Sequence, residues 1–184
     1  MTASSRERSH VVASQELKKF IRSIPDFPKK GILFRDITTL LIDASAFRTA
    51  IDSLANRFKN QGITKVVGIE SRGFLTAAPL AYLLGAGFIP VRKKGKLPYK
   101  TTSVSYQLEY GQDSLEMHLD AVIKGERVLI ADDLLATGGT AKATTELVEN
   151  SGGKIQGLAF LIELSDLKGR EKLRQFDVFS LMSF

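Results

Sequence analysis

The chain has 184 residues, of which 43% are hydrophobic and 25% charged, and its formal net charge is +6. This composition is ordinary for a globular protein, so we expect a single domain over residues 1–184. The absence of cysteine excludes disulfides and thiolate catalysis. No apolar run approaches the roughly 20 residues of a membrane span, and the polar start lacks a signal-peptide core. We therefore expect a cytoplasmic protein with no membrane partner.

The N-terminal third predicts two helices and one strand. Apolar residues at helical spacing predict an amphipathic helix from Gln15 to Ile24, with Ser14 as its N-cap. A stronger apolar stripe predicts a second helix over Phe47–Phe58. The β-branched run Lys65–Ile69 predicts a buried strand.

The middle of the chain changes from helical spacing to alternation. Phe74–Leu84 predicts a packed helix, which Pro79 should kink or cut short, and Phe88–Val91 predicts the next strand. Apolar and polar residues then alternate over Val104–Leu119, on both sides of Gly111–Asp113. This alternation predicts a hairpin with one solvated face and its turn at Gly111–Asp113.

The C-terminal part predicts three more strands and one long helix. The strands are Arg127–Ala131, Ile155–Leu164 and Phe176–Met182, the helix is Gly139–Asn150, and Ser165 should cap a single helical turn. Buried strands alternating with helices predict an α/β fold whose mostly parallel, twisted sheet is flanked by helices. The hairpin would form a flap over the carboxyl edge of the sheet, where such folds bind ligands.

The stretch from Val128 to Ala141 carries the most specific functional signal. A buried strand ends in two adjacent carboxylates, Asp132 and Asp133, and a small-residue turn then opens a helix. Amides of a glycine turn at a helix N-terminus receive a phosphate, and carboxylates can accept hydrogen bonds from sugar hydroxyls. The pattern predicts a ribose 5-phosphate pocket, with its phosphate loop formed by Ala136, Thr137, Gly138, Gly139 and Thr140.

Other interpretations of this stretch are less consistent with its spacing. A Walker A loop requires a lysine where Thr140 follows Gly139, and the dinucleotide fingerprint Gly-x-Gly-x-x-Gly does not occur. An acid pair can also ligate a metal or lie at a helix N-terminus. Because neighbouring residues of an extended segment point in opposite directions, we favour recognition of a polyol.

A second anion site is predicted where the strand ending at Ile69 turns into a helix. Glu70, Ser71, Arg72 and Gly73 follow this strand, and an arginine can grip an anion with two hydrogen bonds. Alone, an arginine at a strand end is commonly a surface residue. Two anion sites beside a ribose site match 5-phosphoribosyl 1-diphosphate (PRPP). Five cations between residues 92 and 100 favour a polyphosphate ligand over nucleic acid, unless they form a solvated loop.

The acid pair with its Thr-Gly-Gly-Thr turn is the PRPP motif of the type I phosphoribosyltransferases, and the chain resembles their adenine phosphoribosyltransferase branch over about residues 24–184. The matching stretches are Pro28–Asp36, Ser71–Phe74, Arg92–Pro98, Leu108–Gly111 and Val128–Thr140. The resemblance implies purine salvage, in which adenine and PRPP give AMP and pyrophosphate. It also implies a homodimer and Mg²⁺ held mainly by PRPP and water, without a direct protein ligand.

The resemblance assigns the ligand-binding residues. Within a small N-terminal hood over residues 14–43, Leu33 would bond the adenine edge beside Arg35, and Phe34 and Leu134 would sandwich the ring. Without the resemblance, Phe34 is more readily interpreted as a core aromatic. Asp132 and Asp133 would hold the ribose hydroxyls. The implied pyrophosphate site comprises Glu70, Ser71, Arg72, Arg92, Lys93 and Lys96.

Further implications concern catalysis and the ends of the site. The family often has a non-proline cis peptide beside Glu70, and Arg92 and Lys96 would reach the neighbouring subunit's pyrophosphate. Glu109 and Tyr110 on the flap and Arg72 would be catalytic, with Glu109 managing the proton at adenine N7. Periodicity alone places Glu109 on the solvated side of a strand. Residues 1–13 lie outside the resemblance, and we expect a flexible extension there.

Two other functions remain compatible with PRPP binding. One is a PRPP-sensing regulator that has lost its chemistry, and the other is a transferase for a different purine. A regulator would usually add a DNA-binding domain and lose flap residues such as Glu109. A different purine transferase would lack Gly-Ile-Leu-Phe-Arg, which occupies residues 31–35 here.

Overall fold

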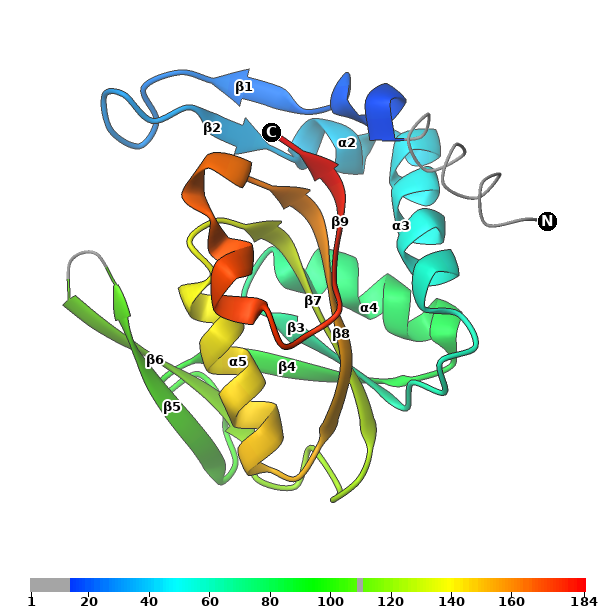
Figure 1. Ribbon diagram of the computed structural model, residues 1–184, viewed down its shortest axis with the longest axis vertical. Helices are drawn as coiled ribbons and strands as arrows, with labels where there is room; N and C mark the ends of the chain where they lie inside the picture. The colour runs from blue at the N-terminus through cyan, green and yellow to red at the C-terminus, as the bar shows by residue number, and fades with distance from the viewer. Residues whose placement is uncertain (1–13, 109–110) are drawn as a thin grey trace. The chain divides into compact units, whose positions relative to one another are not determined.

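The structure, a computed structural model, describes residues 14–108 and 111–184 (Figure 1). It divides into two compact units, Met1–Ser53 and Leu54–Phe184. We describe each unit separately. Helix α3 (Ala44–Phe58) contributes residues to both.

The first unit is built around a short antiparallel hairpin. Strand β1 (Arg22–Ile24) pairs with β2 (Phe34–Asp36), and α2 (Thr38–Ile42) follows. The prediction of a helix over Gln15–Ile24 is therefore wrong in its second half, because only residues 14–18 are helical. Ile24 precedes a proline, which disfavours the helical region of the backbone.

The second unit contains a seven-stranded sheet in the order β5-β6-β4-β3-β7-β8-β9. All pairs from β4 to β9 are parallel, whereas β6 pairs antiparallel with β4 and with β5. The predicted mostly parallel sheet is confirmed. Its strands are β3 (Lys65–Ile69), β4 (Gly87–Lys93), β5 (Thr101–Leu108), β6 (Gly111–His118), β7 (Arg127–Leu135), β8 (Lys154–Glu163) and β9 (Val178–Ser183).

The hairpin of β5 and β6 extends one edge of this sheet, as Figure 1 shows. Its predicted turn at Gly111–Asp113 is wrong, because these residues begin β6 and pair with positions 106–108 of β5. Gly111, Gln112 and Asp113 have the composition of a turn, but the backbone pairing of the two strands continues through them. Residues 109 and 110, which connect the strands, lie outside the described residues.

Helices lie on both sides of the sheet (Figure 1). Helix α4 (Gly73–Leu84) packs on β3, β7 and β4, and α5 (Gly139–Asn150) packs on β5 to β8. Contrary to one predicted alternative, α4 is not cut short at Pro79 and continues to Leu84, where Gly85 in the left-handed conformation ends it. Two 3₁₀ helices, η1 (Ser165–Leu167) and η2 (Gly169–Leu173), connect β8 to β9.

The sheet topology determines where a ligand can approach. Central residues such as Val67 of β3, Ile130 of β7 and Leu158 of β8 are fully buried. The chain leaves β3 toward β4 on one side and leaves β7 toward β8 on the other. The strand order thus reverses between β3 and β7, and open α/β sheets bind ligands at such a reversal, outside the carboxyl ends of the strands.

Candidate active site

The turn between β3 and α4 forms one wall of the site. The Glu70 amide donates a hydrogen bond to the Val91 carbonyl at 2.9 Å, and the Glu70–Ser71 peptide bond is cis, as the resemblance predicts. A Cβ on Gly73 would collide with Oδ1 of Asp132. Only glycine therefore lets the start of α4 approach the acid pair this closely.

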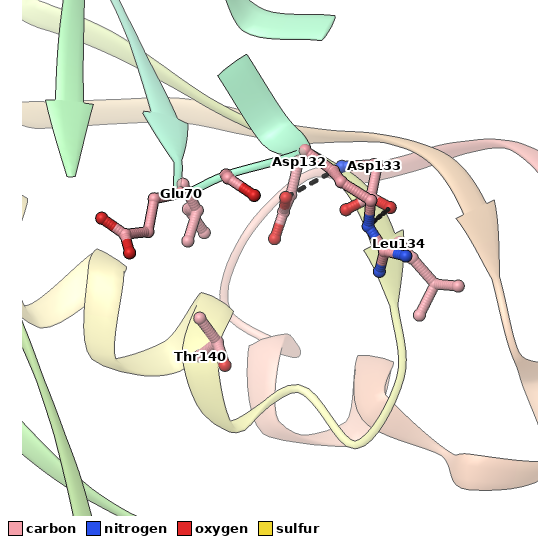
Figure 2. A pocket seen from close by; sticks show the side chains of 8 residues that line it. Glu70, Asp132, Asp133, Leu134 and Thr140 are labelled. Carbon is pink, nitrogen blue, oxygen red and sulfur yellow. Dashed lines mark hydrogen bonds and ion pairs between the residues drawn. The ribbon is translucent and has the colours of Figure 1, made fainter. Parts of the chain in front are cut away.

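The acid pair lies on the last part of β7, opposite this turn. The Asp133 amide donates to Oδ1 of Asp132 at 2.9 Å, and Nε of Arg72 lies 2.8 Å from Oδ2 of Asp133. Figure 2 shows Asp132 and Thr140 directed at the same space from β7 and the start of α5. This space is a cavity of about 310 Å³, lined by Ile69, Glu70, Ser71, Arg72, Asp132, Asp133, Leu134 and Thr140.

The two carboxyls resist ionisation. Burial raises the pKa of Asp132 well above its usual value, and the neighbouring charge of Asp133 raises it further. Burial also raises the pKa of Asp133, although the Arg72 guanidinium acts in the opposite direction. Buried acids without a full set of cations cost folding energy and often mark functional sites. This pair can accept hydrogen bonds from sugar hydroxyls, which are neutral donors and do not require a further cation beside the acids.

The loop from Ala136 to Thr140 forms a second, smaller cavity of about 90 Å³ beside the first, and both cavities share Asp132, Leu134 and Thr140 as lining residues. Gly138 has a φ of +76° and directly precedes α5. The loop from Ala136 to Thr140 contains no charged side chain. An anion in this cavity would be held by backbone amides and the positive end of the helix dipole.

The Glu70 carboxylate binds two of the five cations between residues 92 and 100. Its carboxylate accepts hydrogen bonds from Nε of Arg92 at 2.7 Å and from Nζ of Lys96 at 2.5 Å. Burial tends to raise the pKa of Glu70, but these two hydrogen bonds outweigh it and leave the pKa lowered. In Figure 2 the Glu70 carboxylate points away from the acid pair. Arg92 and Lys96 are thus held by Glu70, and neither is among the residues that line the two cavities.

Lys93 has a different partner from its neighbours in the sequence. Its Nζ lies 3.0 Å from Oδ2 of Asp113 on β6, and the hydrogen bond to Asp113 raises the pKa of Lys93. Lys93 is not among the residues that line either cavity. Its assignment to pyrophosphate stays a prediction.

The predicted adenine residues Leu33, Phe34 and Arg35 belong to the first unit. The ring of Phe34 meets Phe27 edge to face, with centroids 5.1 Å apart, and Nη1 of Arg35 donates to Oγ of Ser23 at 2.5 Å. Stacking of adenine between Phe34 and Leu134 stays a prediction. The predicted catalytic residues Glu109 and Tyr110 lie outside the described residues.

In the structure, two glycines make close contacts that the sequence pattern did not predict. Gly73 belongs to the matching stretch Ser71–Phe74, but nothing in the local sequence indicates its contact with Asp132. Gly169 of η2 packs against the phosphate loop, since a Cβ there would collide with the Ala136 carbonyl. A contact between segments so far apart in the chain is invisible to periodicity.

Among residues 14–108 and 111–184, no cluster of three or more histidine, cysteine or acidic side chains is arranged to hold a metal ion. In the same described part of the chain, no helix has the length and apolar character needed to span a membrane.

Comparison with known proteins agrees with this geometry. The model of the phosphoribosyl transferase domain family matches residues 38–182. The adenine phosphoribosyltransferase of Geobacter metallireducens is 60% identical over 92% of this chain and 99% of its own length. The crystal structure of the Rhodothermus marinus adenine phosphoribosyltransferase is 55% identical, with a TM-score of 0.90 over 95% of this chain and 99% of that one.

A eukaryotic structure is also similar. The Saccharomyces cerevisiae adenine phosphoribosyltransferase, complexed with adenine and D-2,5-dideoxy-2,5-imino-altritol 1,6-bisphosphate, is 42% identical. Its TM-score is 0.88, over 93% of this chain and 99% of that chain.

Proposed function

This chain belongs to the phosphoribosyltransferase family, in its adenine branch, and we propose that the two cavities beside β3 and β7 are where it works. The enzyme transfers the 5-phosphoribosyl group from PRPP to adenine, giving AMP and pyrophosphate in purine salvage. The observation that carries the site assignment is an acid pair between two anion-binding loops, at the point where the strand order reverses.

PRPP lies with its ribose over the acid pair. Asp132 and Asp133 accept hydrogen bonds from the 2- and 3-hydroxyls, and the loop from Ala136 to Thr140 receives the 5-phosphate. Their position supports this role, because both acids line the cavity between the two loops. The pyrophosphate lies along the turn of Glu70, Ser71 and Arg72.

Catalysis separates charge, since an oxocarbenium-like ribose forms as pyrophosphate departs. Arg72 stabilises the departing anion, and so do Arg92, Lys93 and Lys96 where they can reach it. Glu109 accepts or relays the adenine proton at N7, while Tyr110 and the rest of the flap exclude water from the reacting sugar. Glu109→Gln should then lower turnover and leave PRPP affinity nearly unchanged.

Magnesium is required in this proposal. The ion is held mainly by PRPP oxygens and water, without a direct protein ligand. When bound, Mg²⁺ supplies Lewis-acid neutralisation of the diphosphate charge. The side chains of Asp132 and Asp133 hold the sugar, and Arg72 orients the diphosphate.

Adenine is recognised by the segment of Leu33, Phe34 and Arg35 and by Leu134. Backbone hydrogen bonds at Leu33 suit a neutral purine, which presents donors and acceptors and no charge. The yeast relative forms a complex with adenine, which supports adenine as the base. Binding energy for the ring comes from stacking on Phe34 and Leu134.

The enzyme is a cytoplasmic homodimer in this proposal. Helix α4 exposes Leu75, Tyr82 and Leu83, and β4 exposes Phe88, which gives an apolar surface of the kind that subunit interfaces cover. If Arg92 and Lys96 serve the neighbouring site, mixing a Lys96→Ala subunit with an Asp132→Ala subunit should restore activity. Cell fractionation tests the location.

Turnover with different purines tests the proposed function most simply. We expect AMP formation from PRPP and adenine, and rates at least about 1,000-fold lower with hypoxanthine, guanine or xanthine, because a site built for one hydrogen-bonding edge rejects others strongly. PRPP binding without turnover of any purine would identify a regulator. Preferred use of another purine would move the chain to a different branch.

A further inference from the structure

The connection between β8 and β9 contacts the phosphate loop. A Cβ on Gly138 would collide with the Gly169 carbonyl oxygen, and a Cβ on Gly169 would collide with the Ala136 carbonyl and lie 3.0 Å from the Gly138 amide nitrogen. Two backbones therefore pack directly on each other, without side chains between them. Gly169 is buried, and it follows Lys168, which has a left-handed φ of +52°.

The position of Gly169 is fixed by its neighbour Arg170. The guanidinium donates to both carboxylate oxygens of Glu163, at 3.1 and 2.5 Å, and to the Val178 carbonyl at 2.6 Å. Burial tends to raise the pKa of Glu163, but the hydrogen bonds from Arg170 and Ser180, together with the Arg170 charge, outweigh it and leave the pKa lowered. Glu163 is 7% exposed and ends β8 beside Leu135, the last residue of β7.

These contacts form a continuous path from the sheet to the 5-phosphate cavity. Glu163 at the end of β8 binds the guanidinium of Arg170, which belongs to η2. Gly169, the preceding residue of η2, packs against the carbonyl of Ala136 and the amide of Gly138. Loop amides bind a phosphate only if they converge on one point. A loop without charged side chains depends entirely on this convergence.

We propose that Gly169 and the Arg170–Glu163 pair are positioning residues that shape the phosphate loop for the 5-phosphate end of the substrate. We call residues 163–170 the bracket. This inference rests on the proposed function, because it assumes that the loop of Ala136 to Thr140 receives the 5-phosphate. It assigns the pyrophosphate end to a separate support, the β3–α4 turn.

The test separates the two ends of the substrate. Ribose 5-phosphate and pyrophosphate are titrated calorimetrically, in magnesium buffer, into the wild-type chain and into Gly169→Ala and Arg170→Met. Arg174→Ala is the matched control, because it removes an exposed ion pair with Glu171 from the same segment and leaves the bracket intact. Melting temperatures are recorded for every variant.

We expect ribose 5-phosphate affinity to fall at least about tenfold in both bracket variants and pyrophosphate affinity to stay within about twofold, because the bracket touches only one anion site. Arg170→Lys should recover part of the loss. Equal losses for both ligands, or no loss in Arg170→Met, would overturn the bracket alone. If Gly169→Ala does not fold, Arg170→Met decides the question. A wild-type chain that binds neither ligand overturns the proposed function as well.

Discussion

The two loops that we propose to bind anions, at the carboxyl edge of the sheet, differ in the groups that they offer a ligand. The β3–α4 turn works with side-chain charge: Arg72 contacts Asp133, and Glu70 gathers Arg92 and Lys96. The β7–α5 loop has no charged residue from Ala136 to Thr140, and instead depends on a left-handed glycine and a helix N-terminus. The first loop offers side-chain charge, whereas the second offers only the arrangement of its backbone amides.

This difference suits the chemistry of the substrate. The 5-phosphate stays in place throughout the reaction, so a rigid cradle of backbone amides serves it well. The pyrophosphate gains charge as it leaves, and side-chain cations stabilise that charge. The comparison predicts that shape changes damage one end of the site and charge changes the other.

The largest expected effect is loss of shape at the phosphate loop. Gly138→Ala places a Cβ against the Gly169 carbonyl at a φ of +76°, and kcat/KM for PRPP should fall at least about 100-fold as the amides lose convergence. Gly85→Ala is the control, because Gly85 has a φ of +65° with no atom near a new Cβ. Steady-state kinetics of both variants would measure this. Equal activity in the two would break the comparison.

A charge change at the other loop should have the next largest effect. Arg72→Met removes the cation beside Asp133 and should lower kcat/KM for PRPP about 10–100-fold, with most of the loss in pyrophosphate affinity. Arg57→Met removes a more remote ion pair with Asp177 and should change activity little, because partly exposed ion pairs contribute weakly. An Arg72 variant that binds pyrophosphate normally would show that charge is dispensable at this turn.

We expect the buried acid pair to lower the stability of the folded chain while it contributes to PRPP binding. Because burial raises the pKa of Asp132, its ionisation destabilises the folded chain as pH rises from the unfolded value of about 3.9 through the folded pKa. Asp132→Asn removes this penalty, so its melting temperature should exceed that of wild type by about 2–4 °C for each kcal/mol relieved. The difference should widen as pH rises from about 4 toward the folded pKa, and the variant should bind PRPP more weakly than wild type.

Thermal unfolding across this pH range, followed by circular dichroism, measures that effect. A melting temperature of Asp132→Asn that stays below wild type at every pH would contradict the proposed cost of the buried acid.

The smallest effect concerns salt. Raising ionic strength from about 0.05 to about 0.3 M screens exposed charges, and it should weaken pyrophosphate binding about threefold more than ribose 5-phosphate binding. Titration calorimetry at the two salt concentrations gives both affinities. Identical salt dependence would mean that the two loops share one mechanism.

Local sequence predicted most of the fold and pointed to residues that the structure places around one cavity. Buried strands such as Lys65–Ile69 and the helix Gly139–Asn150 have unambiguous periodicity, and both were predicted at their observed bounds. The helix predicted to reach Ile24 failed because tertiary pairing with Phe34 and the following proline outweighed helical spacing. The misplaced turn at Gly111–Asp113 shows the same weakness, since composition does not reveal register.

Contacts between distant segments were beyond prediction from the pattern. Nothing local indicates that Gly169 supports Gly138, that Gly73 makes room for Asp132, or that Glu70 holds Arg92. Each depends on where the sheet places two loops. The residues that bind a ligand are therefore easier to find in a sequence than the residues that hold them in place.

Simultaneous occupation of the two loops tests the central claim most directly. The wild-type chain is saturated with ribose 5-phosphate in magnesium buffer, and pyrophosphate is then titrated into it by calorimetry. If the two loops are separate sites with the sugar between them, pyrophosphate should bind once per chain, with an affinity within about threefold of that without ribose 5-phosphate. Mutual exclusion of the two ligands would show that they compete for one site and would contradict this account.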